Sequence, residues 1–260
     1  MCGVAAGACN GAINVHWSKG SDISDINAKF GAQHTVTGSL GLIFAAIFAK
    51  YVSTMNSVSL WILYSLLTAI HIFANVNCLK LVSFDYLNTD RLAIVCEGFL
   101  DRIQRGESAD KIVVDDPRSV SFQEPLFFGP RRSLPIRMGV SFDALVRLCK
   151  MDKDAIQQAA QDIEDDNYVV GLGEDSIVIV VSDSAHPADR ARAYFYAVVL
   201  RKVVQMDRSL RKASVVHDAV EDVVQRLWPH FERSLDRANW DLNKTELASE
   251  GYEVSISTAQ

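Results

Sequence analysis

Two long stretches almost without charge dominate the first third of this chain. Between residues 30 and 79 the only side chain with a fixed charge is Lys50. An α-helix needs about 20 largely apolar residues to cross the roughly 30 Å hydrocarbon core of a bilayer. The apolar stretches 37–52 and 58–79 are near that length, and the polar residues 53–57 between them predict a turn. The sequence therefore predicts a helical hairpin that crosses a membrane twice.

A hairpin buried inside a water-soluble protein is the alternative, since both stretches are close to the lower length limit for spanning. Trp61 and Tyr64 favour the membrane, because aromatic side chains gather at the interface between lipid and water. Asp25 and Lys29 precede the first stretch and are four residues apart, so one helical turn would pair them. Such a pair keeps both charges in water at the membrane boundary.

Charge is divided unevenly along the 260 residues. Residues 1–80 carry four lysines and two aspartates, which leaves 22 of the 26 basic and 30 of the 32 acidic side chains to the rest. This division is typical of a membrane segment followed by a water-exposed domain. Lys29, Lys80 and Arg91 fall on one side of the hairpin, which the positive-inside tendency assigns to the cytosol or its equivalent. An acidic domain repels phosphates, so no nucleic-acid partner is expected.

The chain beyond residue 80 predicts a domain of helices and short extended pieces. A helical pattern from Leu81 ends at Gly106, and the segments 112–117 and 119–128 are predicted to be short strands or extended pieces, broken by Pro117 and Pro125. A hairpin is predicted over 168–183, where GLGEDS lacks the third glycine of a dinucleotide loop. Further helices are predicted after Ser141 and over 151–167, 186–206 and 213–240, the last with Pro229 inside it.

Gly3, Gly7 and Gly11 are spaced so that a helix would place them on one face, where a second helix can approach closely. A flexible tail is the alternative for this Gly/Ala-rich start. The predicted fold class is a mainly α membrane protein, with a helical hairpin preceded by a Gly/Ala-rich helix and followed by a soluble α+β domain. Its predicted parts are a membrane region over 1–91, a cytosolic domain over 92–240 and a loose polar tail over 241–260.

No phosphate-binding loop, zinc-protease motif or nucleophile elbow occurs in the chain. The five cysteines are widely spaced and form no C-x-x-C pair, so neither a disulfide framework nor a zinc site is expected. The protein is therefore predicted not to be an enzyme and to hold no cofactor or metal. His71 and Asn75 lie one turn apart in the second stretch, where polar groups mark either a transport path or hydrogen bonds between helices.

Two motifs resemble those of the root UVB sensitive proteins, a eukaryotic membrane family. The segment DISDINAKFGAQHT is similar to the family's N-M-A-D-V-S-A-K-D-G-S-Q-E-T. The matching residues are Asp25, Ala28, Lys29, Gly31, Gln33 and Thr35, and the departures are Phe30, Ala32 and His34. The departures replace an acid, a serine and a glutamate, which changes the charge of the motif.

The second motif, HIFANVNCLKLVSFDYLNTDR, is similar to the family's H-x-x-A-N-Y-R-A-V-R-x-L-x-L-x-T-L-N-R-x-R. It keeps His71, Ala74, Asn75, Leu87, Asn88 and Arg91, has Lys80 for an arginine, and departs at Val76 and Asn77. The segments EPLFF and AYFYAVVL resemble the later half of the family domain. The residues expected to matter are therefore Asp25, Lys29, Gly31, Gln33, His71, Asn75, Asn88 and Arg91.

The resemblance implies a role without known chemistry. Plant members of the family are associated with ultraviolet-B responses, auxin transport and pyridoxal phosphate homoeostasis. A non-enzymatic membrane protein that regulates the traffic of a small metabolite or hormone is the leading hypothesis, and a carrier with a polar path at His71 and Asn75 is the second. The resemblance also implies that helices of the family domain precede Met1, and these or another family member are the expected protein partner.

Overall fold

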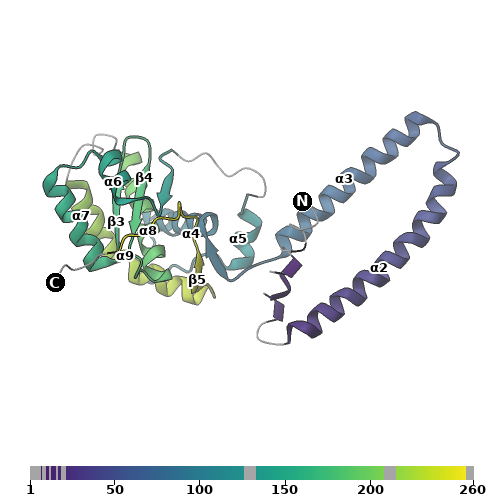
Figure 1. Ribbon diagram of the computed structural model, residues 1–260, viewed down its shortest axis with the longest axis horizontal. Coiled ribbons are helices and arrows are strands. Elements are labelled where there is room, and N and C mark those ends of the chain that lie inside the picture. The colour runs from purple at the N-terminus through teal and green to yellow at the C-terminus, as the bar shows by residue number, and fades with distance from the viewer. Residues whose placement is uncertain are drawn as a thin grey trace. The chain divides into compact units, whose positions relative to one another are not determined.

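The computed structural model describes most of the chain, as two compact units comprising Met1–Cys78 and Leu79–Gln260 (Figure 1). The residues that it describes are 7, 10, 11, 13–15, 17, 18, 22–125, 133–207 and 215–255, with the side chains of 215–218 excepted. The division falls upstream of the predicted boundary at residue 91, because the segment that follows Leu79 contributes buried side chains such as Leu87 and Leu92 to the second unit.

Two long helices form the first unit, α2 (Ile23–Val52) and α3 (Ser57–Leu81). Asp22 is the N-cap of helix α2, because its side chain accepts a hydrogen bond of 2.8 Å from the Ser24 amide. The helix therefore starts well before the predicted apolar stretch and includes the first family motif. Within 23–52 and 57–81, both fully described, no residue is buried, so neither helix covers the other.

The residues described between 7 and 18 are helical, among them Gly7 and Gly11 of the predicted glycine face. Gly3 lies outside the described residues. A Cβ added to Gly7 or Gly11 would meet nothing within 4 Å in the part of the chain that the structure describes.

The helical pattern predicted from Leu81 to Gly106 is wrong in its first part. After α3 comes strand β1 (Tyr86–Asn88), and α4 (Thr89–Gln104) begins only there. The reason is local: the Asn88 side chain accepts the Arg91 amide at 2.8 Å, which starts a new helix at that point. Gly106 follows the helix in a left-handed conformation with φ of 85°, as expected for a residue that ends it.

Neither 112–117 nor 119–125 forms one of the short strands that the sequence allowed. Residues 112–116 have no regular structure, and α5 (Pro117–Gln123) is a short helix. Pro117 occupies its first turn, where the missing amide costs nothing, and Asp116 caps it by accepting the Ser119 amide at 3.0 Å. Pro117, which was predicted to break an extended segment, instead starts a helix. Residues 126–128 lie outside the described part of the chain.

A small mixed sheet in the order β2–β4–β3 forms one layer of the second unit. The predicted hairpin is confirmed: β3 (Tyr168–Leu172) and β4 (Ile177–Val181) pair antiparallel, with Val170 opposite Ile179. Strand β2 (Ile136–Met138) pairs parallel with β4. Helices α6 (Phe142–Cys149) and α7 (Lys153–Asp166) bury Leu145, Ala159 and Ile163 with the sheet residues Val169, Val178 and Val180.

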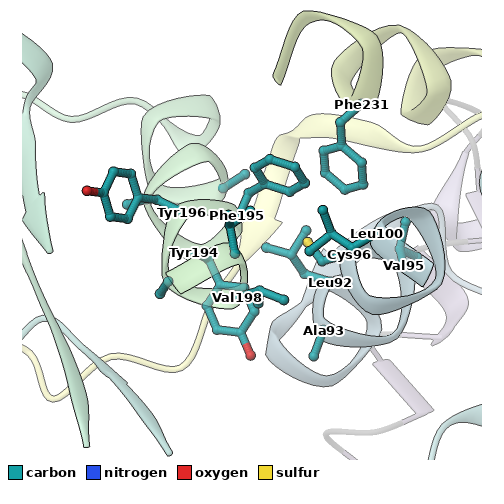
Figure 2. Close-up of a cluster of buried hydrophobic side chains, with 14 of the residues drawn as sticks. Leu92, Ala93, Val95, Cys96, Leu100, Tyr194, Phe195, Tyr196, Val198 and Phe231 are labelled. Atoms are coloured by element: carbon teal, nitrogen blue, oxygen red, sulfur yellow. The ribbon is translucent and has the colours of Figure 1, made fainter. Parts of the chain in front are cut away.

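The main core lies among α4, α8 (Pro187–Met206) and α9 (Val215–Arg237), as Figure 2 shows for the side chains of Leu92, Phe195 and Phe231. The ring centroids of Phe195 and Phe231 are 4.7 Å apart, and that of Phe99 lies 6.2 Å and 5.2 Å from them. Each helix therefore contributes an aromatic ring to one buried cluster, which holds the three helices together.

The predicted loose tail is wrong up to residue 255. Strand β5 (Asp241–Glu246) pairs parallel with β1, and the amides of Glu250, Tyr252 and Val254 bond the carbonyls of Met138, Gly139 and Val181. The polar side chains misled the prediction, since main-chain hydrogen bonds need no apolar sequence. Gly139 permits this close approach: its φ is 67°, and a Cβ there would lie 1.9 Å from the Ser249 hydroxyl.

Candidate functional site

Two residues of the second family motif meet at the start of α4. Asn88 accepts the Arg91 amide with its side-chain oxygen and donates its amide to Glu124 Oε1 at 2.8 Å. Arg91 donates from Nε to Glu124 Oε2 at 2.9 Å, and from Nη1 to the Tyr86 carbonyl at 3.3 Å. Both carboxylate oxygens of Glu124 are thereby bound by motif residues, so this acid joins α4 to the end of α5.

The guanidinium of Arg91 also contacts aromatic rings. Its central carbon lies 5.3 Å from the ring centroids of both Phe84 and Tyr86, within the range of cation–π attraction. Arg91 is 7% exposed, and its partner Glu124 is largely covered too, with 19% of its side chain exposed. An arginine is suited to such a site, because its planar fork bonds a carboxylate while its faces contact rings.

Helix α5 also binds the main chain at the end of α3. Ser121, in α5, donates its hydroxyl to the Lys80 carbonyl at 2.8 Å and lies 3.2 Å from the Val82 carbonyl. The Lys80 carbonyl belongs to the last turn of α3, where intrahelical donors are lacking, and Val82 follows directly after that helix. We name this group of residues the α3 junction; it comprises Lys80, Val82, Phe84, Tyr86, Asn88, Arg91, Ser121 and Glu124.

The first motif forms a continuous helix instead of a cluster. Lys29 Nζ lies 2.6 Å from Asp25 Oδ2, which confirms the predicted pairing on one helical turn. Gly31 and Gln33 serve through their carbonyls, which accept the hydroxyls of Thr35 at 2.9 Å and Thr37 at 2.7 Å. All of these contacts lie within α2.

His71 and Asn75 lie one turn apart on α3, and both are exposed. The Asn75 amide donates to the His71 carbonyl at 2.9 Å, so it is bound within its own helix. The structure therefore brings Asn88 and Arg91 together and pairs Asp25 with Lys29.

The sequence reasoning missed five members of the α3 junction: Val82, Phe84, Tyr86, Ser121 and Glu124. Glu124 begins the segment EPLFF, which resembled the family, but nothing in its spacing from Arg91 indicates a contact. The junction consists of a neutralised ion pair, caps and ring contacts. Its chemistry is that of a structural joint, because each polar group described above already has a protein partner.

A small pocket of about 130 Å³ lies along α4, lined among others by Gly98, Phe99, Arg102 and Asp115. Ligand sites for small molecules occupy about 300 Å³ or more, so this hollow is too small for most metabolites. Within it Arg102 Nη2 lies 3.7 Å from Asp115 Oδ1. Among the described residues, no group of three or more histidine, cysteine or acidic side chains is arranged to hold a metal ion.

Comparisons with known proteins cover nearly the whole chain. Residues 1–102 match a family model described as a vitamin B6 photo-protection and homoeostasis domain. Residues 113–255 match the model of the C-terminal part of root UVB sensitive proteins. No solved structure matches the chain.

Two curated relatives show the same relationship. The chain is 26% identical over 221 residues to protein root UVB sensitive 3 of Arabidopsis thaliana, covering 80% of this chain and 47% of that protein. It is 26% identical over 162 residues to RUS family member 1 of Dictyostelium discoideum, covering 62% of this chain and 28% of that protein. The chain thus spans about half or less of the length of these relatives. Because the C-terminal model alone covers more than half of the chain, this protein belongs to the root UVB sensitive family.

Proposed function

We propose that this protein is an integral membrane member of its family, whose α2–α3 hairpin crosses a bilayer twice and whose folded domain regulates the traffic of a small metabolite without catalysing a reaction. The proposal that the hairpin spans a membrane rests on the exposure of its apolar side chains. Both helices are long and apolar enough to span, and 22 of their large apolar side chains are each at least 41% exposed. Leaving so much apolar surface in water costs on the order of 20 kcal/mol or more.

The spacing of polar and aromatic residues supports the same proposal. From Lys29 to Lys50, and from Trp61 to Lys80, the helical rise is about 30 Å at 1.5 Å per residue, which is the thickness of a bilayer core. A spanning hairpin would therefore place Lys29 and Lys80 at one boundary and Lys50 and Trp61 at the other. Lysine and tryptophan are residues that tolerate this position, because each has an apolar part and a polar tip.

The non-catalytic part rests on the α3 junction, where the motif residues Asn88 and Arg91 are engaged with Glu124 in structural bonds. The metabolite is proposed from the description of the N-terminal family model, which names vitamin B6. The proposal expects pools of pyridoxal phosphate to change in cells that lack the protein and to recover when it is re-expressed.

Alkaline carbonate extraction of the tagged full chain tests the membrane proposal directly. Retention in the pellet is expected, and release into the supernatant would exclude a spanning hairpin. Labelling of single cysteines in sealed vesicles gives the topology. Positions in the turn 53–56 should react from the side opposite to Asp22 and Lys80, and reaction from the same side would contradict the proposal.

A carrier is the second candidate, favoured by the position of His71 and Asn75. Both lie in the middle part of α3 between Trp61 and Lys80, where polar groups in lipid are costly and often mark a path. Uptake of pyridoxal into vesicles reconstituted with the full chain tests this role. If the protein is a carrier, uptake should fall in His71→Ala and in Asn75→Ala. Uptake that is the same with the unaltered protein, with both variants and with empty vesicles would exclude a carrier role.

A further inference from the structure

Helix α5 is fixed to the last turn of α3. Its Ser121 hydroxyl bonds the Lys80 carbonyl, Ser121 itself is 5% exposed, and the neighbouring Val120 is fully buried in the core of the second unit. The residues 79–81 belong to the same compact unit as α5. The short distance between α5 and the end of α3 is therefore a property of one folded body.

The next residue of α5 is Phe122, whose side chain is 46% exposed. Leu79 and Leu81, the chain neighbours of Lys80, are 57% and 58% exposed. Apolar side chains that adjoin Ser121 and Lys80 in the chain are therefore exposed.

The thickness of a bilayer indicates at what depth α5 would lie. If α3 spans from Trp61 to Lys80, the Lys80 carbonyl lies at the edge of the hydrocarbon core. The headgroup layer beyond that edge is roughly 5–7 Å deep, from the difference between the core and the whole bilayer. A residue whose hydroxyl is 2.8 Å from the Lys80 carbonyl therefore stays inside this layer.

We propose that α5 lies in the headgroup layer on the domain side of the membrane, with Phe122 inserted among the lipids. This inference rests on the proposed function, since it requires α3 to span. Lipid is the occupant because the bond between Ser121 and Lys80 keeps α5 at the depth of the headgroups, where Phe122 is exposed. Arg118 and Ser119, exposed on the same short helix, are polar neighbours suited to phosphate headgroups. The domain then touches the membrane at a second point besides the hairpin.

Nanodiscs that contain brominated lipids provide the test with the full chain. An environment-sensitive fluorophore is attached to Phe122→Cys, to Leu42→Cys in α2 and to Met206→Cys at the end of α8, in a background without native cysteines. Leu42 reports on the hairpin, and Met206, which is 76% exposed, is the water-exposed control. Quenching by bromine is expected to be at least threefold stronger at residues 42 and 122 than at residue 206.

The outcomes separate the two proposals. Quenching at residue 42 together with quenching at residue 122 no stronger than at residue 206 overturns the inference and leaves the hairpin in lipid. Weak quenching at residue 42 overturns the spanning hairpin and the inference with it. If the cysteine-free background does not fold, the unaltered protein is labelled with a lipid-soluble photoprobe and digested. The α5 peptide should then be labelled together with α2 and α3, and an unlabelled α5 peptide overturns the inference.

Discussion

Arg91 and Glu124 form an ion pair of 2.9 Å between two helices that are distant in sequence, with 9% and 19% of their side chains exposed. Because little water reaches them, each charge depends on the other for its stabilisation. The pair also fixes where α4 begins relative to the end of α5. The stability of the second unit should therefore depend strongly on this contact.

Replacing Glu124 by alanine is expected to lower the free energy of unfolding by about 3 kcal/mol, because it leaves the Arg91 charge covered and unpaired. Thermal unfolding of the full chain in detergent, followed by near-ultraviolet circular dichroism, measures the loss. The control is Asp143→Ala, which breaks the exposed pair with Arg147, of which 72% and 77% of the side chains are exposed. That change should cost at most about 0.5 kcal/mol, and equal losses in both variants would disprove the prediction.

Asn88 is expected to contribute more than an ordinary helix cap. Asn88→Ala removes both the cap of α4 and the bond to Glu124, whereas Asp152→Ala removes a cap of α7 with one bond of 2.9 Å. The first change should cost about 2 kcal/mol and the second about 1 kcal/mol. A double-mutant cycle with Glu124→Ala measures the coupling free energy between Asn88 and Glu124. Additive losses would mean that the bond between Asn88 and Glu124 contributes nothing.

Gly139→Ala should release the C-terminal segment. The added methyl carbon would meet the Ser249 hydroxyl at 1.9 Å, in addition to the cost of a left-handed φ. Gly106→Ala is the matched control, because Gly106 also has a positive φ but has open space around its Cβ position. The control should cost about 1 kcal/mol. Faster hydrogen exchange at the amides of Tyr252 and Val254 is expected only in Gly139→Ala, and unchanged exchange there would contradict this account.

Replacing one of two similarly exposed side chains by lysine should reduce membrane insertion, whereas the same change at the other should not. Leu42 is 74% exposed in α2 and Met206 is 76% exposed in α8. In water both changes to lysine would be nearly neutral, but a lysine near the centre of a bilayer helix costs about 2.5–3.5 kcal/mol. Leu42→Lys is therefore expected to reduce membrane insertion, measured by glycosylation mapping in microsomes, while Met206→Lys inserts normally. Equal insertion of the two variants would count against a spanning α2.

Cys149 should react slowly in the folded domain. Burial disfavours its thiolate and raises the pKa of the thiol from 9.0 to about 11. At pH 8 the folded thiol therefore has about 100-fold less thiolate than the unfolded one, and alkylation by iodoacetamide should be slower to a similar degree. Residue-resolved mass spectrometry with and without urea measures both rates.

The same pKa determines how stability depends on pH. Between pH 9 and 11 the folded thiol keeps a proton that the unfolded thiol has lost, so this contribution to stability is complete below pH 9 and declines as the pH rises toward 11. Cys149→Ala should remove that part of the decline. A variant whose stability falls as steeply as that of the original protein over this range would refute the assignment.

The sequence predicted best where a local rule decides the structure. Charge depletion marked α2 and α3, the caps at Ser141 and His186 marked two helix starts, and alternating apolar runs marked the β3–β4 hairpin. It failed where a signal has two meanings, since Pro117 can interrupt a strand but here begins a helix. The tail failed because its order comes from main-chain bonds to distant strands.

The candidate site was predictable only in its motif residues. Asn88 and Arg91 were identified by resemblance to the family, but their common partner Glu124 was not, because their contact arises only when α4 and α5 pack. Ser121 is an ordinary serine in the sequence, and its role depends on the position of the Lys80 carbonyl. Contacts of this kind follow from tertiary structure, which no spacing rule in one sequence contains.

The parallel pairing of β1 with β5 sets an order of events during synthesis. Strand β1 emerges directly after the hairpin, but its partner, residues 241–246, is synthesised much later. At 5–20 residues per second the ribosome needs roughly 10–30 s to reach it. In the proposed membrane topology, both hairpin helices are therefore available to the insertion machinery while the domain is still incomplete, and β5 joins the domain after its anchor has met the bilayer.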